Sequence, residues 1–554
     1  MGFGETVLFL SEVVRSNWLA VLLSVVTCLV ITYGLNIVER WKFRHIPGPS
    51  PEFIIGNLAE LKGRNHWEVC STWSEKYGKL YRWFNGRKAV VTISDPDLAQ
   101  EVMLKKFRTF HNRELPEVVS HALPSAMPRM KANMVWAKDK DWASVRSAVQ
   151  PFFHTQELRR YAGSMNRSVE RLKSLLAEHA ESGEPADMRK FFGAFALEVI
   201  GTSAYGVDFS TQTAALEEDP LVSAVTAMFQ QGLFTSGLTL VMQCLPWLAR
   251  VVGLLIRAMP LFSEAARKNA QQRLLTVTTA YVLLKNAEKR VTGKDGEYTE
   301  EEELPWGEAR FNAKQHPYAN TVPAEGSLPD LLMKGKHKTT GEPLDYAQMT
   351  SQTHVFFLAG YDTSANCLSY CIYLLAKNPE EQEKVIEEVD RNSGSEPLTH
   401  DDLEKFPYVQ AVIDEALRLF PPAPGTHRVA EEDVQVGKYV IPKGTQVRIN
   451  MFGMHRDPLL FPEPEKFKPS RFLRDSDEYK NRHPYAYIPF GAGPRKCVGY
   501  KFALQEIALA LVSLYKNYTF SLESSKHEGP LKTKGFLTMS PSEGVWVRIK
   551  RRDQ

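Results

Sequence analysis

The stretch FGAGPRKCVGYKFALQEIALALVSLY, residues 490–515, places a single cysteine, Cys497, in a glycine-rich loop that precedes a long apolar helical pattern. The glycines permit tight turns and let the backbone approach a flat ligand closely. A thiolate in this loop would be stabilised by backbone N–H groups and by the amino terminus of the helix that is expected to begin near Val498. The pattern therefore suits a thiolate ligand of iron, although a lone cysteine in such a loop is more often a packing residue.

Two charged motifs precede this loop. In VIDEALRLFPP, residues 412–422, Glu415 and Arg418 are three positions apart, which puts them on one helix face where they can pair. In FKPSRF, residues 467–472, Arg471 offers a third partner. A Glu–Arg pair with this spacing is by itself most often a solvated surface pair. The interpretation therefore depends on the order of the motifs along the chain.

A further motif, FFLAGYDTSANC at residues 356–367, lies inside a helical pattern that runs from Tyr346 to Ala376. Asp362 and Thr363 follow an Ala-Gly pair, whose small side chains open a groove beside the helix. A hydroxyl at that point can disturb the local carbonyl ladder. The same small residues are also typical of plain close packing between two helices.

Cationic side chains recur at four more places. Trp142 and Arg146 lie one helical turn apart in DWASVRSAVQPFF, and Arg428 follows the turn PPAPGTH. Arg495 lies inside the cysteine loop itself. By themselves, Trp142 and Arg146 are most simply a buried ring beside a surface cation. Arg113 is a weaker candidate than these, because only its rough position supports it.

Together, these motifs resemble the cytochromes P450, the haem-thiolate monooxygenases. FGAGPRKCVG matches the family's ligand loop FxxGxRxCxG at every fixed position, and AGYDTS matches its oxygen-activation motif [AG]Gx[DE]T[ST]. The resemblance covers nearly the whole chain. It implies a mainly α fold with a small β region, and haem b as the cofactor.

The resemblance also assigns roles to individual residues. Cys497 becomes the axial ligand of the haem iron, held in the loop between Phe490 and Gly499. Asp362 and Thr363 become the acid and alcohol that relay protons to dioxygen. The remaining candidates fall into two sets: propionate partners Trp142, Arg146, Arg428 and Arg495, and a structural network of Glu415, Arg418 and Arg471.

The substrate is less well defined than the chemistry. The carboxy-terminal segment resembles both the animal group of drug- and steroid-oxidising enzymes with thromboxane synthase and the plant carlactone oxidases. The segments expected to face the substrate are mostly apolar, so a lipophilic sterol, terpenoid or apocarotenoid, fatty acid or xenobiotic is expected. An oxygen-independent isomerase or dehydratase of thromboxane-synthase type is the alternative, although the intact Asp362-Thr363 pair favours oxygen activation. The aromatic candidates in those segments are Phe229, Phe234, Phe357 and Phe536, each of which could equally be a core residue.

Electrons must come from a separate protein if the resemblance holds. The chain contains neither a GxGxxG nor a GxxxxGK[ST] loop, the signatures of NAD(P)H and ATP binding. The expected partners are NADPH-cytochrome P450 reductase, with cytochrome b5 as a second donor, and O2. Lys496 and Lys501 are the candidates for docking an acidic reductase surface.

The amino terminus predicts a membrane anchor. Residues 16–38 contain no charged side chain and are long enough to cross a hydrocarbon layer of about 30 Å. Arg40, Lys42 and Arg44 follow, so the positive-inside rule places the rest of the chain in the cytosol. A cleaved signal peptide is the competing interpretation. We therefore expect a single-pass anchor in the endoplasmic reticulum membrane over residues 1–46 and a cytosolic catalytic domain over residues 47–554.

Composition narrows the remaining possibilities. A formal net charge of +3 over 554 residues gives no indication of a nucleic-acid partner. The six cysteines are scattered, which favours a reducing compartment, and Cys367 and Cys371 are expected to be packing residues on one helix face. Residues 79–94 predict a hairpin around an Asn-Gly turn, and residues 293–345 predict a long polar surface loop.

Overall fold

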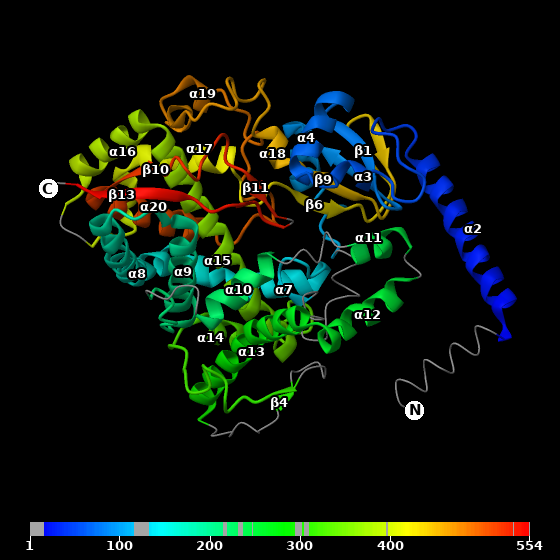
Figure 1. Cartoon of the computed structure of the whole chain (residues 1–554), viewed down its shortest axis with the longest axis horizontal. Helices are drawn as coiled ribbons and strands as arrows, with labels where there is room; N and C mark the ends of the chain where they lie inside the picture. Colours follow the sequence, from blue (N-terminus) through cyan, green and yellow to red (C-terminus); the bar gives the residue numbers. More distant parts are fainter. Residues whose placement is uncertain are drawn as a thin grey trace.

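The structure, a computed structural model, is mainly helical with small β-sheets, which confirms the predicted fold class (Figure 1). It describes residues 16–115, 132–213, 219–230, 237–245, 248–293, 302–303, 310–394, 397–535 and 537–552. Its helices are α2 (Trp18–Lys42), α3 (Leu58–Leu61), α4 (His66–Tyr77), α5 (Pro96–Gln100), α7 (Asp139–Val149), α8 (Thr155–Ser182), α9 (Met188–Ile200), α10 (Pro220–Gln230), α11 (Gly237–Cys244), α12 (Ala249–Phe262), α13 (Glu264–Thr292), α14 (Leu328–Lys334), α15 (Tyr346–Lys377), α16 (Pro379–Asn392), α17 (Pro407–Leu419), α18 (Met451–Met454), α19 (Asp477–Lys480) and α20 (Tyr500–Asn517).

Helix α15 runs through the middle of the helical part and is buried on nearly all sides. It begins at a capping box, in which the Asp345 carboxylate accepts from the Gln348 N–H and the Gln348 side chain accepts from the Asp345 N–H. It packs closely on α9, since a Cβ at Gly360 would lie 3.2 Å from the Ile200 side chain. Close helix packing is thus one reason for the glycine at position 360, whereas Ala359 is exposed.

The largest sheet has the strand order β1-β2-β9-β6. Strands β1 (Leu80–Asn85) and β2 (Lys88–Ile93) form the predicted hairpin, and Gly86 supplies the left-handed conformation of its turn at φ 61°. Strand β9 (Gln446–Ile449) runs parallel to β2 and antiparallel to β6 (Thr426–Val429). The remaining strands are β3 (Ala186–Asp187), β4 (Glu302–Glu303), β5 (Arg310–Phe311), β7 (Val434–Val436), β8 (Tyr439–Ile441), β10 (Tyr518–Leu522), β11 (Thr533–Lys534), β12 (Ser540–Pro541) and β13 (Trp546–Arg551).

Helix α2 extends away from the rest of the molecule (Figure 1). Its apolar side chains are largely exposed, and an 18-residue window within it has a mean hydropathy of 2.2. Arg40 and Lys42 lie in its last turn. By length and composition this helix could cross a membrane.

The prediction of a surface loop over residues 293–345 is wrong for part of that segment. The described residues 310–345 include α14, whose Leu328 and Leu332 are fully buried. The Asn286 side chain of α13 donates to backbone carbonyls of residues 318, 319 and 321, which ties the chain to this helix. The sequence prediction missed this packing because a few buried leucines and backbone hydrogen bonds, rather than a long apolar pattern, attach the segment.

The prediction for Cys367 and Cys371 is confirmed, because both side chains are buried within α15. Among the residues that the structure describes, no group of three or more His, Cys, Asp and Glu side chains could hold a metal ion. The two thiols therefore act as small packing residues.

Candidate active site

The loop around Cys497 is held by its own backbone. The Cys497 N–H donates to the Phe490 carbonyl at 2.9 Å, which closes the loop, and α20 begins at Tyr500 with Gly499 as its N-cap. Gly493 has φ 67°, and a Cβ there would lie 2.1 Å from the Met103 carbonyl oxygen, so only glycine fits. The helix thus begins two residues later than the sequence predicts.

The Cys497 side chain has exposed surface, yet protein atoms crowd it closely enough that burial raises the pKa of its thiol. The Gly499 N–H acts in the opposite direction, and the charges of Arg146 and Arg113 add to that effect. These groups would stabilise a thiolate once a positively charged partner offsets the desolvation.

Four arginines gather near this loop: Arg113, Arg146, Arg428 and Arg495. Burial lowers the pKa of Arg495 to about 9 and that of Arg113 to about 10. Burial also holds the pKa of Arg428 well below its usual value, and the charges of Arg113 and Arg495 act in the same direction. Within the described parts of the chain, none of the four forms an ion pair with an Asp or Glu side chain. Such a cluster is electrostatically complete only with an anionic ligand.

The four arginines differ in how much of each guanidinium is already engaged. Arg495 donates to the backbone carbonyls of residues 111, 134 and 137 and lies 4.3 Å from the centroid of the Trp142 ring. Arg146 donates to the Lys496 carbonyl at 2.9 Å. By contrast, Nε and Nη2 of Arg428 and Nε of Arg113 are buried without a hydrogen-bond partner. The buried N–H donors without a partner therefore belong to Arg428 and Arg113. Arg113 was the weakest of the four candidates on sequence grounds.

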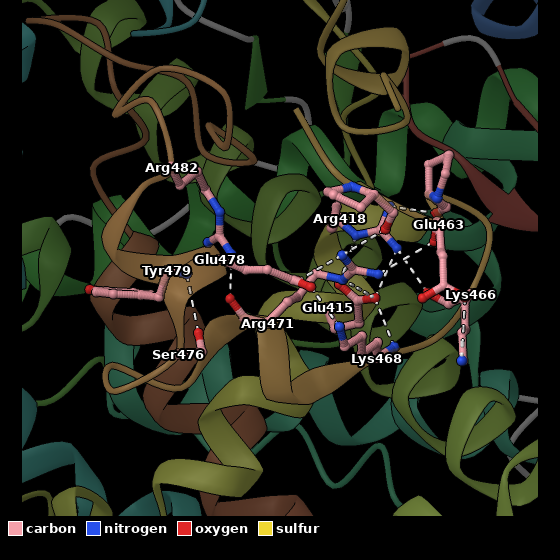
Figure 2. Close-up of polar contacts among 12 residues, drawn as sticks. Glu415, Arg418, Glu463, Lys466, Lys468, Arg471, Ser476, Glu478, Tyr479 and Arg482 are labelled. Carbon is pink, nitrogen blue, oxygen red and sulfur yellow. Dashed lines mark hydrogen bonds and ion pairs between the residues drawn. The ribbon is translucent and has the colours of Figure 1, made fainter. Parts of the chain in front are cut away.

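Glu415, Arg418 and Arg471 form a buried ion network (Figure 2). Arg418 donates to both Glu415 carboxylate oxygens at 2.7 and 2.8 Å, and Arg471 donates to Glu415 at 3.1 Å. The side chains of all three residues are fully buried. Arg471 also pairs with Glu478 at 3.0 Å, a fourth member that no motif indicated. The three predicted residues thus meet in space although Arg471 lies in a different segment.

Asp362 and Thr363 occupy neighbouring positions on α15 but have different partners. Asp362 is 1% exposed, forms an ion pair with Arg189 of α9 and accepts from the Asn366 side chain at 3.0 Å. Although burial disfavours a charged guanidinium, the charge of Asp362 holds the pKa of Arg189 above its usual value. The Thr363 hydroxyl donates to the Ala359 carbonyl at 2.7 Å. No sequence motif pointed to Arg189.

Comparison of this sequence with known proteins shows to which family it belongs. A family model described as "Cytochrome P450" matches residues 46–546. The chain belongs to the cytochrome P450 family. It is 28% identical to rat cytochrome P450 3A9 over 97% of both chains. It is also 30% identical to rabbit cytochrome P450 3A6 over 96% of this chain and 97% of the relative, and 29% identical to human cytochrome P450 3A5 over 97% of both.

This P450 is therefore a haem b protein and a monooxygenase of that family. The buried, unpartnered donors of Arg428 and Arg113 fit the carboxylates of haem propionates, since an anion would satisfy both their hydrogen bonding and their charge. The exposed surface of Cys497 fits a thiolate that faces the cofactor. The residues present are thus chemically suited to this prosthetic group.

A cavity of about 2260 Å³ extends from the first sheet to α15. Tyr361 and Asp362 line it, and Phe229 contributes an aromatic wall with its ring centroid 6.5 Å from that of Tyr361. Of the two interpretations open for Phe357, the structure favours a core residue, because its side chain is fully buried and its ring centroid lies 4.5 Å from that of Tyr205. Phe234 and Phe536 lie outside the described residues. Charged side chains, among them Lys88, Arg189 and Arg448, line this cavity beside the apolar ones.

A buried acid on α20 makes the stability of this P450 depend on pH. The Ser364 hydroxyl donates to Glu506 at 2.8 Å, and burial raises the pKa of the Glu506 carboxyl to about 8 from 4.5. Between these values the folded protein holds a proton that the unfolded chain releases, so stability falls as pH rises. We expect Glu506→Gln to flatten this fall, because glutamine keeps an acceptor for Ser364 without a charge.

The measurement is the apparent melting temperature of wild type and variant between about pH 5.5 and 8.5. The control is Glu387→Gln, which removes an exposed carboxylate from α16 and should leave the wild-type pH profile unchanged. Parallel profiles for wild type and Glu506→Gln would show that Glu506 does not retain its proton in the folded state.

Proposed function

We propose that this P450 inserts one oxygen atom from O2 into a lipophilic small molecule, a sterol, terpenoid or apocarotenoid, fatty acid or xenobiotic. Electrons would come from a separate NADPH-cytochrome P450 reductase, with cytochrome b5 as a second donor. The observation that carries the proposal is the pair Asp362-Thr363 on α15, next to a large cavity that Asp362 lines. The family membership of the chain supports the chemistry, and the cavity volume supports a substrate of substantial size.

The roles of the chain's own residues follow from their positions. Cys497 would supply the thiolate that holds the haem iron, with Phe490 and Gly499 shaping its loop. Arg428, Arg495, Arg146 and Trp142 would hold the propionate side of haem, and we add Arg113 to this group because its Nε is unengaged. When bound, haem b supplies the iron at which dioxygen is activated. Glu415, Arg418 and Arg471 would stabilise the fold behind it.

Proton delivery would depend on Asp362 and Thr363. Arg189 and Asn366 hold the Asp362 carboxylate in one orientation at the edge of the cavity. The Thr363 hydroxyl donates its hydrogen to the Ala359 carbonyl. Its oxygen lone pairs therefore remain available to accept a hydrogen bond from a protonated group. A proton taken up from solvent by the Asp362 carboxylate would pass to the Thr363 oxygen as the Thr363 hydroxyl gives its own proton to the reacting oxygen, so that both residues return to their starting states.

The alternative is an oxygen-independent isomerase of thromboxane-synthase type. The relatives reported above are all cytochromes P450 3A, which does not favour it. The test is turnover of candidate lipophilic compounds by the purified enzyme with and without NADPH, reductase and O2. A requirement for all three supports the monooxygenase, whereas conversion of a peroxide substrate without any of them supports the isomerase.

We further propose that residues 1–46 anchor the enzyme in the endoplasmic reticulum membrane by a single span and that residues 47–554 form a cytosolic catalytic domain. The exposed apolar surface of α2 supports the anchor, and the basic residues Arg40 and Lys42 in its last turn support this orientation. Lys496 and Lys501 would face an acidic reductase surface next to the thiolate loop.

A further inference from the structure

One wall of the large cavity is a face of the sheet β1-β2-β9-β6. Alternate residues of a strand point to the same face, and directly paired residues of neighbouring strands share it. Arg448 on β9 is in register with Thr92 on β2 and with His427 on β6. Arg448, His427 and Trp83 all line the cavity. A guanidinium therefore lies on a face that encloses the space where a ligand would bind.

The contacts of Arg448 leave much of its hydrogen-bonding capacity unused. Its Nη2 donates to Nε2 of His66, the first residue of α4. Its Nε is buried without a hydrogen-bond partner. Gly425 creates the space for this side chain, since a Cβ there would lie 3.2 Å from Nη2 and 3.3 Å from Nε. The guanidinium is thus held by a hydrogen bond to His66 and lies in the space that Gly425 leaves beside it.

No carboxylate in the described residues forms an ion pair with Arg448. Glu68 lines the same cavity, but its Oε1 accepts from the Asn65 side chain at 2.9 Å. Glu114, also at the cavity, pairs with Lys88 at 2.8 Å. Burial holds the pKa of His66 well below its usual value and lowers that of His427 to about 3, so both imidazoles are neutral at pH 7. Arg448 therefore brings an uncompensated positive charge to this wall.

We propose that Arg448 binds the carboxylate of an amphipathic, lipophilic substrate in this cavity. The inference rests on the proposed function and adds to it the chemical class of the substrate. A planar guanidinium with unengaged donors fits a carboxylate in a bidentate manner. Because Phe229 and Tyr361 line the same cavity, a ligand anchored at Arg448 would extend its apolar part towards α15.

The test is the binding of laurate and of methyl laurate to the purified holoenzyme, measured by isothermal titration calorimetry. The two probes have the same chain, and only laurate carries the charge. We expect wild type to bind laurate about tenfold more tightly than the ester, and Arg448→Gln to bind the two within about twofold. Lys62→Gln is the matched control: it removes an exposed cation from the rim of the same cavity and should retain the preference.

Two results would overturn the inference: a wild type that binds both probes equally, or a preference that persists in Arg448→Gln. If Arg448→Gln is recovered without haem, Arg448→Lys is measured in its place. Lysine keeps the charge but loses the fork geometry, so this variant should prefer laurate less strongly than wild type does. A preference for laurate as strong as that of wild type would contradict the proposal. Failure of the proposed function is a separate outcome, because an enzyme without NADPH-dependent turnover would still report its preference for laurate by calorimetry.

Discussion

Replacing Glu415 by glutamine is expected to abolish most of the folded, haem-containing protein. The variant keeps the shape of the side chain but removes the negative charge that Arg418 and Arg471 share. Both guanidinium groups are fully buried, so water cannot compensate for the loss. Breaking a buried ion pair by removing one partner destabilises a protein by about 3–5 kcal/mol, which is a large part of the stability of an ordinary domain.

The measurement is the yield of haem-containing protein and its apparent melting temperature. Glu463→Gln is the matched control, since Glu463 pairs with Lys466 at the same spacing of three residues but with both side chains more than half exposed. An exposed pair contributes about 0–1 kcal/mol, so this variant should resemble wild type. A Glu415→Gln protein that melts with wild type would show that the network does not stabilise the fold.

Replacing Asp362 by asparagine is expected to have the second large effect, on turnover. Asparagine cannot carry a proton between partners, and it leaves the largely buried Arg189 guanidinium without its ion pair. Loss of a general acid–base group lowers rates by about 10²- to 10⁴-fold. We expect the rate of product formation to fall by a factor in this range, while the haem content of the purified protein is retained.

The measurement is product formed and NADPH consumed in the reconstituted system. Ser369→Ala is the control, because it removes a buried hydroxyl from the same helix whose only described partner is the Ala365 carbonyl. Arg189→Gln separates proton transfer from positioning: if Arg189 positions the carboxylate, this variant should lower product formation although Asp362 remains, and Arg189→Lys, which keeps the charge, should restore part of it. Wild-type product formation by Asp362→Asn would remove Asp362 from the mechanism.

Sequence patterns predicted well wherever a short local motif determines the structure. The Asn-Gly turn of the first hairpin and the long helix that holds Asp362 are found at the predicted positions, because turn chemistry and a capping box act over a few residues. The Cys497 loop is similarly local, since Gly491 and Gly493 supply the left-handed conformations of its turns at φ 71° and 67°. Its helix starts later only because the last turn before it ends at Gly499.

Most contacts between segments far apart in the sequence could not be predicted from it. Arg189 pairs with Asp362 because α9 packs across α15, and no pattern within either helix indicates this pairing. Glu478 joins the Glu415 network through Arg471, seven residues earlier, and there the spacing alone gave no sign of pairing. Arg448 looks like an ordinary exposed strand residue until strand pairing assigns its face to the cavity. Apolar character left Phe357 open between core and substrate contact, because both positions favour the same type of side chain.

The most direct test of the central claim is the reduced, carbon-monoxide-bound difference spectrum of the full-length protein, wild type against Cys497→Ser. If Cys497 is the axial ligand of the haem iron, wild type gives the Soret band typical of a haem thiolate, and the serine variant loses that band even where it retains haem. A thiolate-type Soret band that survives in Cys497→Ser would contradict the assignment, and with it the account of the active site built around this loop.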